Sequence, residues 1–222
     1  MTGPGDADRS AAGSAAAAGS AAAAAEATGW FEPLYAAAAR GSSAVPWDRP
    51  AATPLLVDWA AGLSGTGRRA LVVGCGLVRD AEFVAGLGFA TTAFDIAPTA
   101  VRTARQRHPG SAVDYRVANL LDLPPDWAGA FDLVVESNTV QALPRSLRPR
   151  AAAAVAVPVA PGATLLVLAA RAVPGEDAGP PWPLSRADLD LFTAGGLTLV
   201  SVQAVPSAEG TAAERWRAEF RR

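Results

Sequence analysis

The sequence predicts a doubly wound α/β domain with a mostly parallel sheet of seven strands, a helical N-terminal cap and a C-terminal antiparallel hairpin. From Arg69 onward, short apolar runs alternate with stretches of helical periodicity, which is the rhythm of βαβ units with right-handed crossovers. The first apolar run, Leu71 to Val73, breaks at a glycine turn, Gly74 to Gly76, before a helical pattern resumes. The last two runs, 197–205 and 213–220, have no helical stretch between them, so they predict the hairpin.

The chain of 222 residues, half of them hydrophobic, is long enough for one α/β domain with a sizeable core. Residues 1–28 are almost wholly Ala, Gly and Ser and lack large apolar side chains for packing, so we expect a disordered or loosely helical extension. The domain then covers residues 29–222, with the N-terminal cap at 29–67 and the sheet core at 68–222.

The expected cap contains two clusters of aromatic side chains. The first, Trp30 to Tyr35, leads into a helix, and the second lies in Val45 to Pro50. Large apolar residues recur at helical spacing from about Pro50 to Ala61, which predicts a further helix capped by Asp48 or Thr53.

The sheet core is expected to alternate strands and helices. Strands are predicted near 70–74, 90–95, 112–117, 131–136 and 163–169, and helices near 79–87, 98–108, 145–157 and 185–194. The segment 173–183 is rich in Pro and Gly, so we expect an irregular loop that can arch over the ligand-binding edge of the sheet.

Composition excludes several classes of function. The 19 basic residues are all Arg and are set against 21 acidic ones, so the net charge of −2 offers no footprint for nucleic acid. One cysteine, Cys75, and one histidine, His108, form neither an internal disulfide nor a Cys/His metal site, which indicates a cytoplasmic protein without a metal. We read Cys75 as a buried small hydrophobe and His108 as the end of a helix. No membrane span is expected, and nothing in the sequence indicates an oligomeric state.

Polar or glycine residues follow each of the first four predicted strands. They are Gly74 and Gly76 after the first, Asp95 after the second, Asn119 after the third and Glu136 after the fourth. In open parallel sheets, ligands bind outside the carboxyl ends of the strands, where the strand order reverses. These side chains are therefore expected at one ligand site.

The spacing between the glycine turn and Asp95 indicates a nucleoside ligand. The interval from Gly76 to Asp95 is 95 minus 76, or 19 positions, close to the roughly 20 that separate a glycine turn from a ribose-binding acid. The third glycine of a dinucleotide fingerprint is missing, since Arg79 stands there and Val78 stands where many nucleotide folds keep a small residue. This favours a cofactor without a pyrophosphate. Asp95 also has a simpler reading, as the cap of a helix that begins near Pro98.

Several motifs resemble those of class I S-adenosylmethionine-dependent methyltransferases, and within them those of the thiopurine, thiol and halide methyltransferase group. The matching pieces cover most of residues 30 to 150 and are Pro46-Trp-Asp48, Val73-Gly-Cys-Gly76 with Asp80, Phe94-Asp-Ile96, Asn119-Leu-Leu121, Phe131-Asp-Leu-Val-Val-Glu136, Gln141-Ala-Leu-Pro144 and Leu147-Arg-Pro149. This resemblance implies a Rossmann-like fold, S-adenosyl-L-methionine as the cofactor and a small molecule as the substrate.

The resemblance also implies roles for individual residues. The implied cofactor-binding residues are Trp47, Gly74, Cys75, Gly76, Asp95, Ile96, Asn119, Leu120 and Glu136. Glu136 is also the candidate general base, because a hydroxyl or a protonated amine needs one. The candidate pocket for the methyl acceptor consists of Trp30, Phe31, Tyr35, Ser137, Asn138 and Trp182. Trp30, Phe31 and Tyr35 are equally well explained as the apolar face of a helix that packs on the sheet.

Two departures from the family pattern bear on function. Asn119 replaces a common Asp; its amide oxygen can accept a hydrogen bond but carries no charge. Ser137, Asn138 and Thr139 replace an aromatic-rich stretch, which argues against halide or thiol specificity.

We therefore expect methyl transfer from S-adenosylmethionine to an S, O or N nucleophile of a small molecule. A NAD-dependent oxidoreductase is the first alternative, disfavoured by the missing third glycine and by the lack of lysine. A non-catalytic S-adenosylmethionine-binding module is the second. Two further expectations are that Trp216 and Phe220 belong to the core and that Arg145, Arg148 and Arg150 form a solvated helix face.

Overall fold

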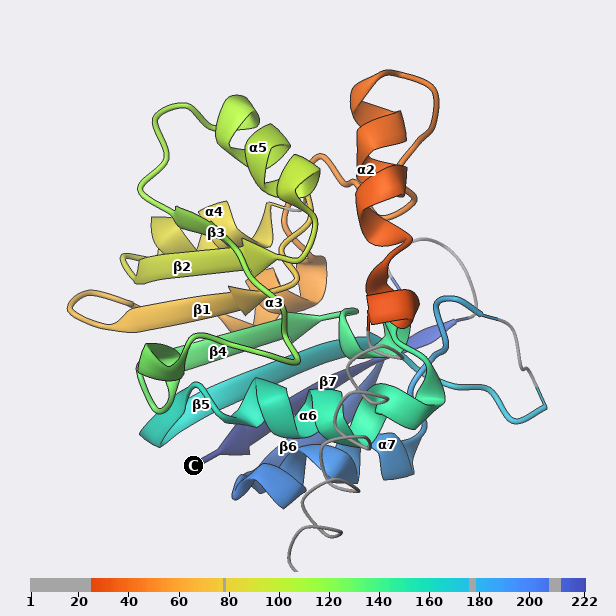
Figure 1. The fold of residues 1–222 in the computed structure, drawn as a ribbon. Helices are drawn as coiled ribbons and strands as arrows, with labels where there is room; N and C mark the ends of the chain where they lie inside the picture. Colours follow the sequence, from red (N-terminus) through yellow and green to blue (C-terminus); the bar gives the residue numbers. More distant parts are fainter. Residues whose placement is uncertain (1–24, 78, 176–178, 208–212) are drawn as a thin grey trace, which may run out of the picture.

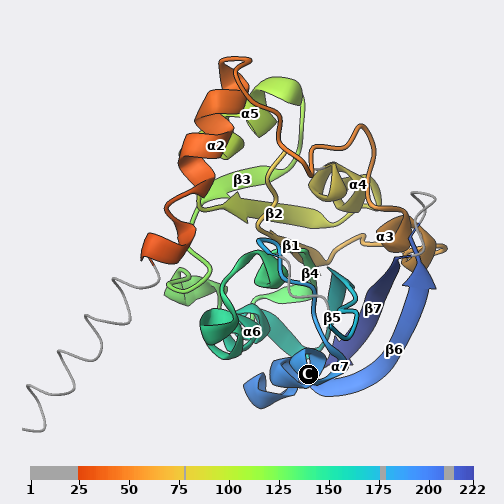
Figure 2. The same cartoon turned by 90° about the vertical axis from the view of Figure 1, so that its right-hand side faces the viewer.

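The computed structural model describes residues 25–77, 79–175, 179–207 and 213–222. They form one seven-stranded sheet in the order β3-β2-β1-β4-β5-β7-β6, covered by helices on both faces (Figures 1 and 2). The strands are β1 (Arg69–Val73), β2 (Ala90–Asp95), β3 (Asp114–Val117), β4 (Phe131–Ser137), β5 (Val159–Ala170), β6 (Thr198–Pro206) and β7 (Glu214–Arg221). The predicted fold class is confirmed.

The central strand β1 determines where a ligand can bind. It pairs in parallel with β2 on one side and with β4 on the other, so the direction of winding reverses at β1. In register, Val73 lies opposite both Phe94 of β2 and Glu136 of β4. The residues that follow these three strands therefore emerge side by side at one edge.

The antiparallel hairpin predicted at the C-terminus is present. Strand β7 pairs antiparallel with both β5 and β6, and β6 forms the edge of the sheet. Trp216 and Phe220 of β7 are buried, as predicted, while the neighbouring side chains Arg215 and Glu219 are partly exposed. This alternation is the pattern of a strand with one buried face.

The helices and 3-10 turns also follow the predicted order. They are α2 (Phe31–Ala39), α3 (Pro54–Trp59), α4 (Asp80–Gly86), α5 (Pro98–Arg107), η1 (Pro125–Trp127), η2 (Val140–Ala142), η3 (Arg145–Leu147), α6 (Arg148–Ala156), α7 (Arg186–Asp190) and η4 (Leu191–Gly195). Helix α2 stands beyond the edge of the sheet to which the arrowheads of β1 and β2 point (Figure 1) and lies beside α5 (Figure 2).

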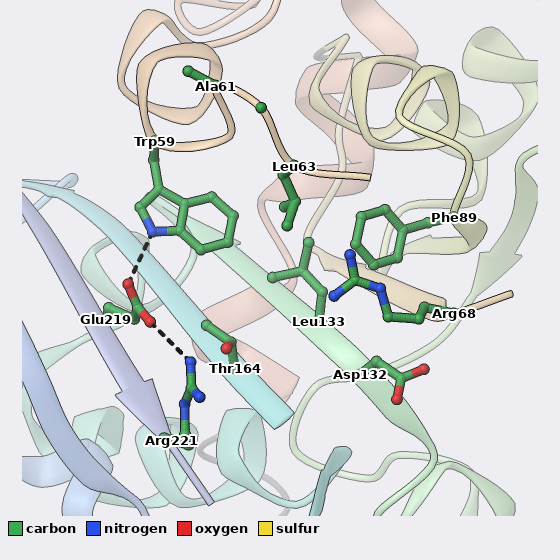
Figure 3. Close-up of a pocket in the computed structure, with 11 residues that line it drawn as sticks. Trp59, Ala61, Leu63, Arg68, Phe89, Asp132, Leu133, Thr164, Glu219 and Arg221 are labelled. Atoms are coloured by element: carbon green, nitrogen blue, oxygen red, sulfur yellow. Dashed lines mark hydrogen bonds and ion pairs between the residues drawn. The ribbon is translucent and has the colours of Figure 1, made fainter. Parts of the chain in front are cut away.

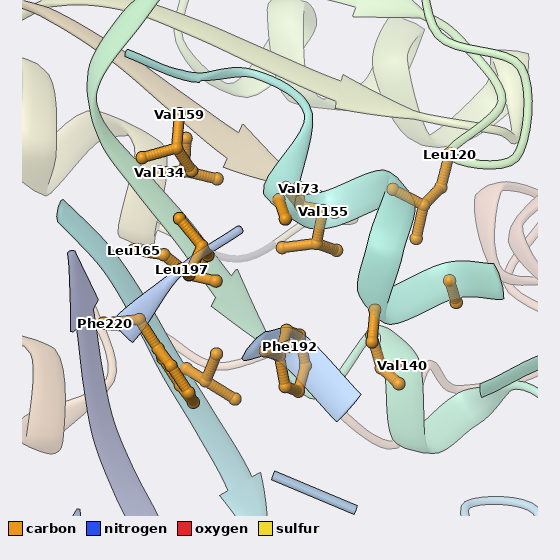
Figure 4. Close-up of a cluster of buried hydrophobic side chains, with 14 of the residues drawn as sticks. Val73, Leu120, Val134, Val140, Val155, Val159, Leu165, Phe192, Leu197 and Phe220 are labelled. Atoms are coloured by element: carbon orange, nitrogen blue, oxygen red, sulfur yellow. The ribbon is translucent and has the colours of Figure 1, made fainter. Parts of the chain in front are cut away.

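The core has two parts, one on each face of the sheet. One cluster joins β-strand residues to α6 and η4, and it includes Phe192, Leu197 and Phe220 (Figure 4). The other cluster places Leu56 of α3, Val84 of α4 and side chains of α5 against the opposite face. Because parallel strands are covered on both faces, β1 is buried along nearly its whole length.

The helix predicted from Pro50 to Ala61 is shorter than expected, and neither of the two side chains predicted to cap it does so. It runs only from Pro54 to Trp59, with Thr53 at the N-cap position. The Thr53 side chain does not cap it but donates to Asp80 Oδ2 at 3.0 Å. Asp48 instead accepts two hydrogen bonds of 2.8 Å from Arg107.

Arg148 contradicts the prediction of a solvated helix face. Arg145 and Arg150 are exposed, but only 2% of Arg148 is accessible to solvent. Its guanidinium reaches Asp188 of α7, which a reading of local periodicity cannot foresee.

Some predictions concern the ends and loops of the chain. Residues 25–28 are helical, whereas 1–24 of the predicted extension and Val78 lie outside the described residues. The described part of the 173–183 loop contains no helix or strand, as predicted. Within the described residues, no helix is long and apolar enough to cross a membrane.

Candidate active site

A cavity of about 470 Å³ opens at the carboxyl edge of β1, β2 and β4. It brings together eleven of the predicted site residues, namely Trp30, Phe31, Tyr35, Trp47, Gly74, Asp95, Ile96, Asn119, Leu120, Ser137 and Asn138. The remaining four, Cys75, Gly76, Glu136 and Trp182, do not line it. The sheet edge and the N-terminal cap therefore contribute to one site.

The glycine turn requires residues without side chains. Gly74 has φ +58° and Gly76 has φ +48°, a region that other residues rarely adopt. A Cβ on Gly74 would collide with the side chain of Thr139, and one on Gly76 would lie 2.6 Å from Tyr35 Oη. Cys75 between them is 3% exposed, and burial raises the pKa of its thiol, so it packs as a small hydrophobe.

Asp95 connects the glycine turn to the start of α5. Its Oδ2 accepts the backbone N–H of Gly76 and its Oδ1 accepts that of Ala97, both at 2.9 Å. Helix α5 begins at Pro98 with Ala97 at the N-cap position, so Asp95 is not the cap itself. Burial raises the pKa of the Asp95 carboxyl to about 6. A carboxylate offers about four acceptor positions, which leaves two for a ligand.

Aromatic side chains of the cap form the opposite wall of the cavity. The rings of Trp30 and Phe31 stack with centroids 4.1 Å apart, and Trp47 meets Trp30 edge-on at 5.9 Å. Trp47 Nε1–H donates to Tyr35 Oη at 2.8 Å. Tyr35 also packs in a small cluster against α5. The two explanations of these aromatics, as a pocket wall and as the apolar face of a helix, are therefore compatible.

Helix α2 is attached to the sheet core through a carboxylate. Glu32 of α2 accepts the backbone N–H of Thr99 at 2.9 Å and also accepts its hydroxyl. Thr99 lies in the first turn of α5, where the helix dipole favours a negative charge. The contact sets the distance between the aromatic wall and the loop that follows β2.

The prediction that Glu136 is a general base requires correction. The side chain is fully buried and does not line the cavity. Its Oε1 accepts the backbone N–H groups of Thr139 and Val140 at 2.6 and 2.9 Å, and Oε2 is buried without a hydrogen-bond partner in the described structure. Burial raises the pKa of Glu136 to about 7. This geometry indicates that Glu136 supports the η2 turn.

Replacing Glu136 with glutamine tests this reassignment. Between the ordinary pKa and about 7, the unfolded chain loses the proton while the folded protein keeps it, so stability falls as the pH rises through this window. Glutamine keeps an oxygen for Thr139 and Val140 and does not ionise. We therefore expect Glu136→Gln to be more stable than the natural protein at pH 8 but not at pH 5, in urea unfolding. A pH-independent difference would contradict this.

Trp182 also requires correction. Its side chain does not line the cavity, although its neighbours Pro180 and Pro181 do, and its backbone N–H donates to the carbonyl of Gln141 at 2.8 Å. The predicted loop therefore reaches the site through its prolines.

Sequence reasoning missed several wall residues. Arg215 of β7 donates through Nη2 to Asn138 Oδ1 at 2.6 Å, which holds Asn138 at φ +64°. Thr139 and Gln141 also line the cavity; both lie in stretches that the family resemblance singles out, but neither is among the predicted site residues. Asn119 Oδ1 accepts the N–H of Leu121 at 2.9 Å and so shapes its own turn.

A second hollow, of about 360 Å³, lies at the opposite edge of the sheet (Figure 3). Three of its polar side chains interact, since Trp59 Nε1–H donates to Glu219 at 3.1 Å and Arg221 lies 3.5 Å from the same carboxylate. It contains none of the predicted site residues. Among the described residues no group of His, Cys, Asp and Glu side chains could hold a metal ion.

A family model matches most of the chain. The matching model describes thiopurine S-methyltransferase and covers residues 40–215. A solved structure from work on the conversion of a disulfide bond into a thioacetal group during echinomycin biosynthesis is 28% identical. The two structures have a TM-score of 0.69, with 86% of this chain and 93% of the other covered.

Two further comparisons concern methyltransferases. The N-methyltransferase NodS from Bradyrhizobium japonicum WM9, in complex with S-adenosyl-L-homocysteine, shares the fold. It has a TM-score of 0.65 at 20% identity, covering 86% of this chain and 98% of that one. A ubiquinone biosynthesis O-methyltransferase from Xanthomonas axonopodis pv. citri is 38% identical over 97 residues, or 42% of this chain and 41% of the relative. The chain thus spans about two fifths of the length of the curated relatives it matches.

Proposed function

Because the chain belongs to the thiopurine S-methyltransferase family of S-adenosylmethionine-dependent methyltransferases, we propose that it transfers a methyl group to a sulfur atom of a small molecule. The observation that carries this proposal is the single cavity that joins the glycine turn and Asp95 to the aromatic cap. One end of it suits a nucleoside and the other an apolar acceptor. The proposal places this activity in a domain at residues 29–222. It also places the protein in the cytoplasm, where a chain with a single cysteine needs no disulfide.

The residues present fit the cofactor. Asp95 keeps acceptor positions that suit the two ribose hydroxyls, and Ile96 and Leu120 offer apolar surface on which a purine would pack. Gly74 lets a ligand approach the backbone closely. The faces of Trp30 and Trp47 attract a cation, such as a sulfonium. When bound, S-adenosylmethionine supplies an already activated methyl group.

The protein's own part in the reaction is to position the acceptor and to exclude water. In-line transfer requires the reacting atoms to be held about 3 to 3.5 Å apart, which a site lined by both the sheet edge and the cap favours. The aromatic cap above and Pro180 and Pro181 beside it cover the acceptor with apolar surface. This keeps water away from the reacting atoms.

The choice of sulfur rests on which ionisable groups line the cavity. In the described wall they are Tyr35, Asp95, Arg49 and Arg215. Burial raises the pKa of Tyr35 far above neutrality, and the acceptor positions of Asp95 that Gly76 and Ala97 leave open are the ones proposed for the ribose hydroxyls. None of these is suited to accept a proton from a hydroxyl. A thiol ionises near neutral pH without such help, because its ordinary pKa is about 8.5.

Two of the comparisons bear on the choice of sulfur as the acceptor atom. The family name specifies sulfur, and the echinomycin-related protein is described by a conversion at a disulfide bond. The missing aromatic stretch after β4 argued against thiols, but the cap brings Trp30, Phe31 and Trp47 to the same cavity. The apolar surroundings that an aromatic stretch would supply are therefore provided from another part of the chain.

Calorimetry and a matched set of acceptors test the proposal. We expect S-adenosylhomocysteine to bind and NAD not to bind; the reverse result would restore the oxidoreductase alternative. Thiophenol, phenol and aniline should then be compared at pH 7.5, and we expect methylation of thiophenol to be fastest. Methylation of phenol alone would show that the acceptor atom is oxygen. Binding of S-adenosylhomocysteine without methylation of any acceptor would favour a non-catalytic module.

A further inference from the structure

Gln141 is a buried polar residue that also forms part of the cavity wall. Only 4% of it is exposed, and it lies in η2 directly after β4. Its side-chain Oε1 accepts the backbone N–H of Ala170 at 2.7 Å, and its backbone carbonyl accepts that of Trp182 at 2.8 Å. The residue is thereby held between the end of β5 and the loop that carries Pro180 and Pro181.

The bond to Ala170 determines which way the amide of Gln141 points. A backbone N–H needs an acceptor, so the amide oxygen faces Ala170 and the Nε2 group faces away from it. Among the residues that the structure describes, Nε2 has no hydrogen-bond partner. It is also not one of the completely buried side-chain atoms that lack a partner. Since Gln141 lines the cavity and its amide oxygen is held by Ala170, we infer that the two N–H donors of Nε2 are the side of the amide that a ligand in the cavity can reach.

The position of Gln141 separates it from the proposed cofactor end. Asp95 is the last residue of β2, whereas Gln141 follows β4 and contacts the end of β5, on the far side of β1. With neighbouring strands about 4.8 Å apart, the two sites are separated by roughly 10 to 14 Å along the sheet edge. The cavity wall after β4 and in the proline loop includes the apolar residues Ala142, Leu143, Pro180 and Pro181 beside the polar residues Asn138, Thr139 and Arg215.

We propose that Gln141 determines substrate specificity by donating a hydrogen bond from Nε2 to an uncharged acceptor atom of the substrate, a ring nitrogen or a carbonyl oxygen. The inference rests on the proposed function, because it assigns this end of the cavity to the methyl acceptor. The substrate class that fits is an apolar, ring-containing thiol with one such atom. A site built to donate a hydrogen bond discriminates against the analogue that lacks the acceptor, because the donor is then left unpaired.

Two substitutions separate this role from structural support. Gln141→Glu keeps an oxygen for the N–H of Ala170 but presents an oxygen in place of the donor. Gln141→Met removes both interactions and so reports the cost to the fold. The probes are benzyl mercaptan and the three pyridylmethanethiols, which differ from it only by one ring nitrogen. Their affinities are measured by calorimetry on protein saturated with S-adenosylhomocysteine, and kcat/KM is measured with S-adenosylmethionine.

We expect the natural protein to bind at least one pyridyl isomer about fivefold to tenfold more tightly than benzyl mercaptan. Both variants should lose this preference, while Gln141→Glu keeps its affinity for S-adenosylhomocysteine within about twofold. No preference in the natural protein, or an unchanged preference in Gln141→Glu, would overturn the inference. A preference in binding without methylation of any thiol would instead count against the proposed function and leave the role of Gln141 in recognition intact.

Discussion

Asp95→Ala is expected to weaken the binding of S-adenosylhomocysteine by roughly a hundredfold or more in calorimetry. The substitution removes the acceptors proposed for the two ribose hydroxyls, and hydrogen bonds to a charged group contribute about 1.5 to 3 kcal/mol each. It also releases the backbone N–H groups of Gly76 and Ala97, which Asp95 holds at 2.9 Å. The substitution therefore removes both the support of the glycine turn and the hydrogen-bond partner of the ligand.

Asp95→Asn separates these two effects. Asparagine has one acceptor oxygen, so its NH₂ group must face the N–H of either Gly76 or Ala97, which leaves a donor opposite a donor. We expect an intermediate loss of affinity, about tenfold.

Asp132→Asn is the matched control for the substitutions at Asp95. Asp132 also accepts a backbone N–H, that of Arg69 at 2.8 Å, but it is exposed and lies at the start of β4, at the opposite edge of the sheet. Its substitution should leave binding unchanged. Equal losses for Asp95→Asn and Asp132→Asn would show that Asp95 acts only through stability.

The geometry of the proposed cofactor end of the cavity was predictable, because it depends on which residues stand at the strand ends. A strand followed by Gly74 and Gly76, and another ended by Asp95, must deliver these residues to the same edge once the strands are parallel and adjacent. The missing third glycine then narrowed the choice of cofactor.

The acceptor end was less predictable, because its residues meet only through contacts between distant segments. Gln141 is oriented by Ala170, 29 positions away, and no local pattern indicates that contact. Glu136 occupies the end of a strand, as a ligand-binding residue would. Its side chain, however, turns back to hold Thr139 and Val140. Sequence position located the strand end correctly but gave no information on the direction of the side chain.

Arg148 is the clearest failure of periodicity, because a charged residue near two exposed arginines is normally solvated. Its Nη1 lies 2.9 Å from Asp188 Oδ2, and Nη2 donates to the carbonyl of Trp182 at 2.6 Å. Burial raises the pKa of Asp188, but hydrogen bonds from Ser185 and the charge of Arg148 outweigh it and lower the pKa overall. The pair thus fastens α6 to the segment that follows Pro181.

Arg148→Met is therefore expected to destabilise the protein by about 3 to 5 kcal/mol in urea unfolding, because it leaves Asp188 and the Trp182 carbonyl without their buried partner. Arg186→Met is the matched control. Arg186 pairs with Asp190 in the same helix as Asp188, but both side chains are about half exposed, at 46% and 59%, so its loss should cost less than about 1 kcal/mol.

The pH dependence of Arg148→Met provides an independent check. A carboxylate with a lowered pKa stabilises the fold above its ordinary pKa and loses that contribution as the pH falls through the acid range. The difference between the natural protein and Arg148→Met should therefore shrink on acidification, while that for Arg186→Met stays small at every pH. If both variants lose the same stability, the Arg148–Asp188 pair does not hold the loop, and the backbone bonds of Gln141 and Leu184 and the bond from Trp216 to Leu184 remain to position it.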